Sequence, residues 1–163
     1  MFPPYVFWAV FAACCTYGLW RGGAPERMMA FAFLVAGLAT PLVNLPPAGR
    51  FYSVSIGVLA IDLALLGSVI AIALRADRFW PILVAGMQIV IILAHLVKFA
   101  NPDLIRRAYA IMIAGWSYPQ LLLLALGSWR HRMRIRAHGT DISWSNFSKS
   151  SIRRTPMSGR PVL

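Results

Sequence analysis

Residues 51–74 have the sequence FYSVSIGVLAIDLALLGSVIAIAL, an apolar run that contains one acidic residue, Asp62. The run is long enough to cross the roughly 30 Å hydrocarbon core of a bilayer as a helix. A carboxylate at the centre of a membrane span is costly, so it marks a functional site or a polar contact between helices. The run therefore predicts a membrane helix with one position of special interest.

Four more apolar runs accompany this one. Hydrophobic residues make up 59% of the 163 positions and charged residues only 13%, whereas about a quarter of a soluble domain is charged. Five such runs in succession, with almost no amphipathic helix between them, indicate a membrane protein. We expect an all-α bundle, residues 1–129, with transmembrane helices at 4–20, 28–44, 51–74, 79–98 and 108–127.

The distribution of Lys and Arg predicts the orientation of this bundle. If the C-terminus is cytoplasmic, the inside segments carry twelve of the sixteen basic residues and the outside segments carry four. Positive charge in short loops is retained on the cytoplasmic side. A signal peptide in place of the first span is disfavoured, because residues 1–5 carry no basic residue. We therefore expect the N-terminus outside and the C-terminus in the cytoplasm.

The C-terminal segment, residues 130–163, is rich in Ser, Arg, Gly and Pro and has no sustained apolar period, which predicts a disordered basic tail. Its first residues form a juxtamembrane basic cluster of the kind that binds anionic lipid headgroups. Nucleic acid is not the expected partner, since no aromatic residues or recognition motif accompany the cluster. The candidate headgroup-binding residues are Arg130, Arg132, Arg134 and Arg136.

Polar residues recur at one depth of the predicted bundle. At 1.5 Å per residue from the outer boundary, Asp62 lies about 16 Å deep, Gln88 about 15 Å, and the segment 117–120 about 14 to 18 Å. His95, with Lys98 one turn beyond it, lies only about 5 Å deep, which argues against direct cooperation with Asp62. The candidate midplane site is Asp62, Gln88, Ser117, Tyr118 and Gln120, and His95 and Lys98 are outer-side polar residues.

Helical periodicity refines this arrangement. In the third span Gly57, Ala60, Ala64, Gly67 and Ala71 form a stripe of small residues, which permits close helix contact and predicts a central position in the bundle. In the fourth span the four residues that share a polar face are Pro81, Gln88, His95 and Lys98. In the fifth span Pro119 removes a backbone hydrogen bond and predicts a kink near Gly115.

The sequence lacks the usual signatures of catalysis and cofactor binding. It has no Walker loop, dinucleotide fingerprint, GxSxG or HExxH motif. No cofactor or metal is expected: a single histidine, His95, lies within a span, and the adjacent Cys14 and Cys15 have no ligand-like spacing to other residues. We predict no catalytic residues, although a membrane enzyme or cofactor binder that uses His95 and the tyrosines remains one alternative.

A resemblance covers the last two spans. The segments Phe79-Trp80-Pro81 and Trp116-Ser117-Tyr118-Pro119, with His95 and Tyr109-Ala110 between them, resemble a pattern in small uncharacterised multi-span bacterial membrane proteins. The resemblance implies a bacterial inner membrane, in which the outside N-terminus would be periplasmic, and carries no activity.

Two functions fit these observations better than catalysis. The leading one is an accessory or structural membrane protein in which the midplane polar layer fixes helix pairing, within a larger complex or homo-oligomer. The alternative is a proton- or ion-coupled transporter or channel subunit in which Asp62 is the protonatable site. They differ in whether water and solutes reach Asp62.

Overall fold

Five α helices make up the described part of the chain, and each coincides with one of the predicted apolar runs. The computed structural model describes residues 4–43, 56–101, 106–139, 141 and 144. The helices are α1 (Pro4–Arg21), α2 (Ala24–Val43), α3 (Ile56–Arg75), α4 (Trp80–Ala100) and α5 (Arg106–His138). The prediction of an all-α fold is confirmed, because these residues contain no strand beyond one isolated bridge between Ala76 and Trp144. The predicted residues 51–55 of the third run lie outside the described part.

Local sequence explains where the helices begin and end. The Gly22-Gly23 pair separates α1 from α2, and Pro25 and Glu26 occupy the first turn of α2, where proline and a negative charge are favourable. Pro81 occupies the first turn of α4. Gly139 closes α5 with φ of 73° and donates its backbone N–H to the carbonyl of Ile135, which is a left-handed C-terminal cap.

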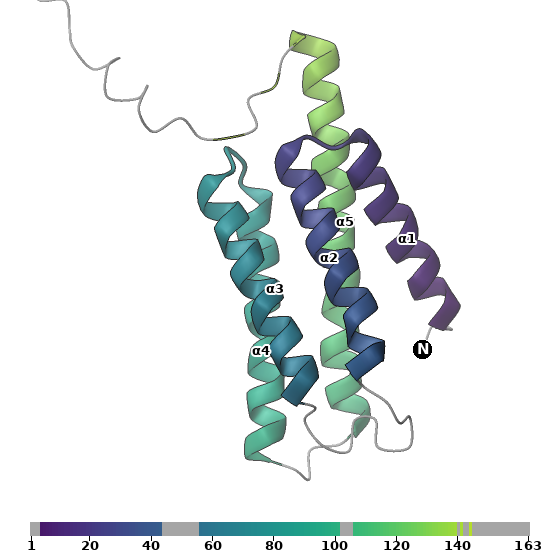
Figure 1. Ribbon diagram of the computed structural model, residues 1–163, viewed down its shortest axis with the longest axis vertical. Helices are drawn as coiled ribbons and strands as arrows, with labels where there is room; N and C mark the ends of the chain where they lie inside the picture. Colours follow the sequence, from purple (N-terminus) through teal and green to yellow (C-terminus); the bar gives the residue numbers. More distant parts are fainter. Residues whose placement is uncertain (1–3, 44–55, 102–105, 140, 142–143, 145–163) are drawn as a thin grey trace, which may run out of the picture.

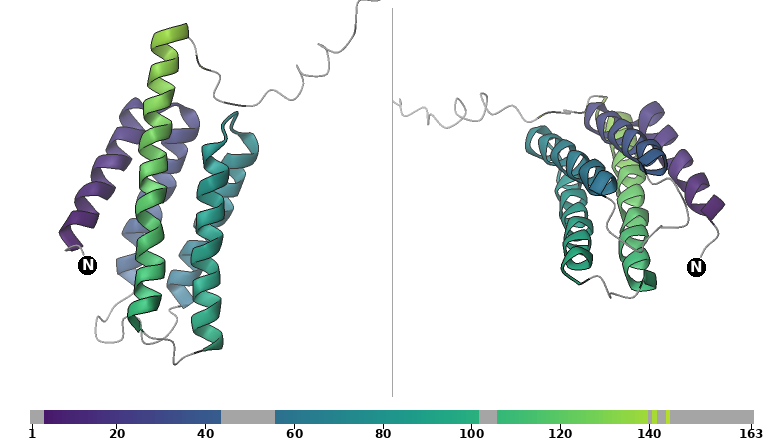
Figure 2. Two further views of the ribbon diagram at one scale, coloured as in Figure 1. Left: turned by 180° about the vertical axis from the view of Figure 1, so that it is seen from behind. Right: turned by 60° about the horizontal axis from the view of Figure 1, so that its bottom comes forward.

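The helices run alternately up and down and form a ring (Figures 1 and 2). Each helix packs against the next one in sequence, from α1 to α5. Helix α5 also packs against α1, and this contact closes the ring. Helices α2 and α5 make a further contact across it. At Gly18 of α1 an added Cβ would lie 3.1 Å from the Cβ of Ala30, so the absence of a side chain lets α1 approach α2 closely.

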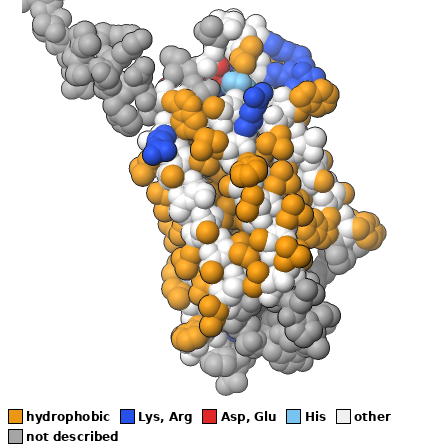
Figure 3. Space-filling model, in the orientation of Figure 1, with side chains coloured by type: hydrophobic (Ala, Val, Ile, Leu, Met, Phe, Trp, Pro, Cys, Tyr) orange, Lys and Arg blue, Asp and Glu red, His pale blue; other side chains and the backbone are white. Residues whose placement is uncertain are grey.

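Membrane character is evident from the helices and the surface. Three of them, α2, α3 and α4, are long and apolar enough to cross a bilayer. Hydrophobic side chains cover much of the flank of the bundle seen in Figure 3, while Lys and Arg side chains gather toward the end where α5 projects. This pattern suits a membrane protein with one basic end.

The prediction that the third span is the centre of the bundle is wrong. Helix α3 contacts α2 and α4 only, and its buried residues are Val69 and Ile72. Most of its small-residue stripe is exposed, and an added Cβ at Gly67 would meet no atom within 4 Å. A stripe of small residues permits close packing without requiring it. Helices α2 and α5, which each have three neighbours, occupy the centre.

The prediction of disorder is wrong for residues 130–138. Helix α5 continues through these residues to His138, well beyond the predicted end at residue 127. The segment contains no glycine or proline before Gly139, and its residues have no feature that would stop a helix. Residues 140, 142–143 and 145–163 of the predicted tail lie outside the described part of the chain.

Candidate functional site

Asp62 joins α3 to α4 through both of its carboxylate oxygens. The side-chain amide of Gln88 donates to Oδ1 at 3.1 Å and approaches the backbone carbonyl of Asp62 at 3.3 Å. His95 Nε2 lies 2.9 Å from Oδ2. Gln88 and His95 are seven residues apart and therefore two turns apart on one face of α4. The Asp62 carboxylate lies between these two side chains and contacts both.

A second glutamine extends this network to α5. Gln120 Nε2 donates to Gln88 Oε1 at 3.0 Å, and both glutamine side chains are buried. Asp62, Gln88 and Gln120 thus form a chain of hydrogen bonds through three helices. The structure brings together three of the five predicted midplane residues, Asp62, Gln88 and Gln120. We call Asp62, Gln88, His95 and Gln120 the central network.

The contact between His95 and Asp62 corrects the prediction that they lie too far apart to cooperate. Gln88 and His95 are seven residues apart, about 10.5 Å along α4, and the Asp62 carboxylate contacts both of them. The depth estimate compared backbone positions and left out the reach of the Asp62, Gln88 and His95 side chains.

A cavity of about 400 Å³ adjoins the central network. All five helices line it, and its polar lining includes Asp62, Gln88, Ser117 and Gln120. The Asp62 side chain keeps 16% of its surface exposed although both oxygens have donors. Because a carboxylate has about four acceptor positions, Asp62 retains capacity for a further donor from the cavity.

Aromatic side chains form the wall of the cavity on the side of α1. The rings of Phe7, Trp8 and Phe11 contact one another, with centroids 5.5 to 6.0 Å apart. Phe33 of α2 also lines the cavity. The cavity therefore combines one carboxylate, several amide and hydroxyl groups, and an aromatic wall, which is a lining suited to a small solute with an apolar body and a polar tip.

The remaining predicted site residues have separate positions. Ser117 lines the cavity and donates to the carbonyl of Ile113 in its own helix at 3.3 Å. Tyr118 packs its ring edge-on against Phe7 at 5.4 Å. Lys98 is buried, as are the other three residues predicted on the polar face of α4. Sequence periodicity therefore identified that face correctly.

A second polar cluster, which the sequence did not predict, lies at the end where α5 projects. Arg78, in the turn between α3 and α4, pairs with Glu26 of α2 at 3.3 Å and with Asp141 at 2.6 Å. Asp141 also accepts from His131 and from Arg134, the latter at 3.0 Å. Glu26 and Arg78 are almost completely buried. We call these five residues the end cluster.

The end cluster changes the expectation for one headgroup-binding candidate. Arg134 donates to Asp141 and is thereby part of an ion pair within the protein. Arg130 and Arg136 are exposed and Arg132 is half-buried. Binding of headgroups by these three residues stays a prediction. In the sequence, the end cluster is indicated only by two acidic residues, Glu26 and Asp141, that lie in segments with basic residues.

Metal binding is not indicated for the described residues, which contain no group of three or more His, Cys, Asp or Glu side chains placed to hold an ion. Cys15 is part of the buried hydrophobic core, and Cys14 packs against it. Both cysteines are free thiols.

Comparison with known proteins adds no further information: no family model matches the chain, and no curated protein or solved structure matches it significantly.

Proposed function

We propose that this chain is a multi-pass membrane protein of the transport class, a carrier or channel subunit, that binds a small cation in the cavity beside Asp62. The observation that carries the proposal is the cavity itself. It has a volume of about 400 Å³, within the usual range for small-molecule sites, and the partly exposed carboxylate of Asp62 forms part of its wall. An intramembrane carboxylate that faces a cavity is typical of an ion or proton pathway.

The chemistry of the lining favours a cation over an anion. Asp62 offers negative charge, and the faces of Phe7, Trp8 and Phe11 can attract a cation through their ring quadrupoles. Among the described residues that line this cavity there is no Lys or Arg. A proton or a protonated amine fits such a lining. The His95–Asp62 pair, at 2.9 Å, provides a place where a proton can be held between the two side chains.

The proposed membrane placement is five crossings in a bacterial inner membrane, with the N-terminus outside. Its support is the alternating direction of five helices and the concentration of basic residues at one end. Helix α5, with 33 residues, is about 50 Å long and exceeds the roughly 30 Å hydrocarbon core. Its basic end would then project into the cytoplasm. Reporter fusions after Arg21, Asn101 and His138 test this orientation.

The cation site is tested with tetraalkylammonium ions, from tetramethyl to tetrabutyl, and detergent-solubilised protein. We expect saturable binding by equilibrium dialysis and a change in tryptophan fluorescence that disappears in Trp8→Phe. Asp62→Asn should abolish binding while the protein remains folded. The matched control is Asp77→Asn, which removes an exposed carboxylate outside the cavity. Equal binding by wild type and Asp62→Asn would contradict the proposal.

A second candidate, an accessory or structural membrane protein, is favoured by a different observation. Both carboxylate oxygens of Asp62 accept from α4, as a polar lock between helices requires. Under this function Asp62→Asn leaves every activity of the parent complex unchanged, because an amide still makes hydrogen bonds. Co-purification of a partner protein after mild solubilisation, together with a silent Asp62→Asn variant, would support the structural function.

A further inference from the structure

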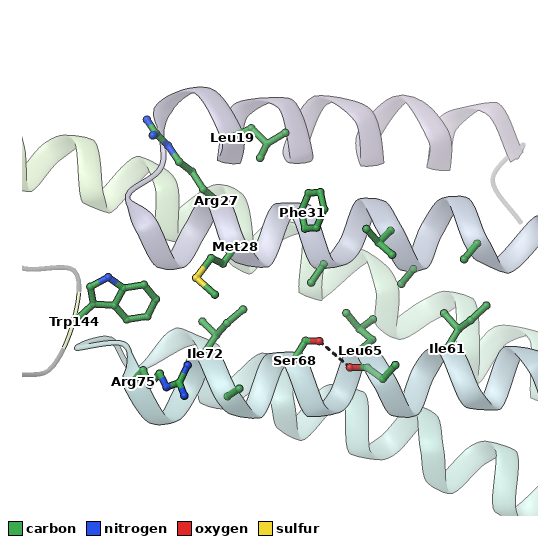
Figure 4. A pocket seen from close by; sticks show the side chains of 16 residues that line it. Leu19, Arg27, Met28, Phe31, Ile61, Leu65, Ser68, Ile72, Arg75 and Trp144 are labelled. Carbon is green, nitrogen blue, oxygen red and sulfur yellow. Dashed lines mark hydrogen bonds between the residues drawn. The ribbon is translucent and has the colours of Figure 1, made fainter.

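A groove of about 730 Å³ runs along the outside of the bundle between α2 and α3 (Figure 4). It is separate from the central network, none of whose residues lines it. Alanines of α2, such as Ala32 and Ala36, and of α3, such as Ala64 and Ala71, form part of its lining. These short side chains cannot fill the space between the two helices, so the groove stays open.

The groove is apolar along most of its length and charged at one end. Its lining contains two charged residues, Arg27 of α2 and Arg75 of α3, and both are exposed. Trp144 lies at the same end, where its backbone pairs with Ala76 in an isolated bridge (Figure 4). Ser68, the other polar residue of α3 in the groove, donates its hydroxyl to its own helix at 2.9 Å.

This distribution matches the chemistry of a phospholipid. From Ile61 to Arg75 the α3 side of the groove extends about 21 Å, more than half of the roughly 30 Å hydrocarbon core, so one acyl chain fits along it. Arginine binds phosphate with directed hydrogen bonds, and tryptophan favours the headgroup level of a bilayer. Arg75 ends α3 and Arg27 lies in the first turn of α2, where both helices would leave the membrane.

We propose that the groove binds a phospholipid with an anionic headgroup, with one acyl chain between α2 and α3 and the phosphate near Arg27 and Arg75. This site is distinct from the basic residues of α5 and does not depend on cation binding beside Asp62. Charge complementarity selects the lipid over a second copy of the chain, because a second apolar helix would gain nothing from two arginines at one end.

The test is native mass spectrometry of full-length protein released from vesicles of equal parts phosphatidylglycerol and phosphatidylcholine. The wild type should retain one phosphatidylglycerol, in at least tenfold preference to phosphatidylcholine. Arg27→Gln/Arg75→Gln should lose this preference. Ala64→Phe, which fills the groove at an exposed position, should lose the bound lipid, and circular dichroism verifies that each variant is folded.

The control variant is Arg130→Gln/Arg136→Gln, which removes the same charge from exposed positions of α5 and should retain the lipid. Equal retention of both lipids by the wild type, or loss of preference in the control as well as in the groove variant, would overturn the proposal. A mass for a dimer that Ala64→Phe abolishes would also overturn it, since the groove would then hold a second copy. Competition by inorganic phosphate alone would show a free anion site and contradict lipid binding.

Discussion

The central network and the end cluster are both polar and both join several helices. They differ in their charged groups and in whether they border a cavity. The end cluster pairs two carboxylates with two guanidinium groups and an imidazole, and its Glu26 and Arg78 side chains are at most 3% exposed. The central network has one carboxylate, which contacts the amide of Gln88 and the imidazole of His95, while Gln120 donates to Gln88; the network borders a cavity.

This difference separates a structural role from a binding role. In the end cluster each acidic group has a basic partner, and the cluster fastens the start of α2, the α3–α4 turn and the end of α5 to one another. In the central network Asp62 keeps acceptor capacity toward a space that a solute can enter. Substitutions in the end cluster should therefore reduce stability first, whereas substitutions at Asp62 should reduce binding first.

The largest stability effect is expected for Arg78→Ala. Removing this guanidinium takes away the basic partner of buried Glu26 and one of the basic partners of Asp141. Breaking a buried ion pair costs about 3–5 kcal/mol. Thermal unfolding in detergent, followed by circular dichroism, measures the loss. Arg136→Ala, at an exposed position of the same end, should leave the midpoint unchanged. If both variants unfold alike, the end cluster does not hold the bundle together.

An intermediate effect is expected for Asp62→Leu. This change removes the carboxylate oxygens that face Gln88 and His95, although Gln88 keeps the backbone carbonyl of residue 62 at 3.3 Å, and weakened hydrogen bonding of a buried polar group costs about 1–3 kcal/mol. Asp62→Asn should cost less, because an amide oxygen still accepts. The same unfolding assay compares them, with Ser68→Ala as a control whose hydroxyl bonds only its own helix. A larger loss in Asp62→Asn than in Asp62→Leu would contradict the hydrogen-bond account.

The smallest effect is expected for the link between Gln88 and Gln120. Hydrogen bonds between membrane helices average about 0.6 kcal/mol in double-mutant cycles. A cycle with Gln88→Leu, Gln120→Leu and the double variant should give a coupling energy near that value. The measurement is the unfolding midpoint in a denaturing detergent. A coupling indistinguishable from zero would separate α5 from the central network.

The helices could be predicted from sequence because each contains an apolar run, and three of them, α2, α3 and α4, are long and apolar enough to cross a membrane. The meeting of Asp62 with Gln88 and Gln120 could also be predicted, since depth along a helix depends only on residue number and approximate ends. The contact of His95 with Asp62 could not be predicted in this way, because the estimate compared backbone depths and left out the side chains, which let Asp62 contact both Gln88 and His95 across two turns of α4.

Lateral arrangement could not be predicted. Depth says nothing about which helices are neighbours, so the small-residue stripe of α3 was mistaken for a central surface. The end cluster joins Glu26, Arg78 and Asp141, which are far apart in sequence and fall outside the predicted apolar runs. Its recognition required the continuation of α5 beyond residue 127, which places His131 and Arg134 beside them.

The central claim, that a solute can reach Asp62 through the cavity, is tested most directly by cysteine accessibility. In a Cys14→Ser/Cys15→Ala background, Ser117→Cys places a thiol in the cavity lining and Leu122→Cys places one on an exposed apolar face of the same helix. We predict that a water-soluble thiol reagent modifies Ser117→Cys in membrane vesicles, that tetraethylammonium slows this reaction, and that Leu122→Cys stays unmodified. Labelling of Ser117→Cys no faster than Leu122→Cys would contradict the account.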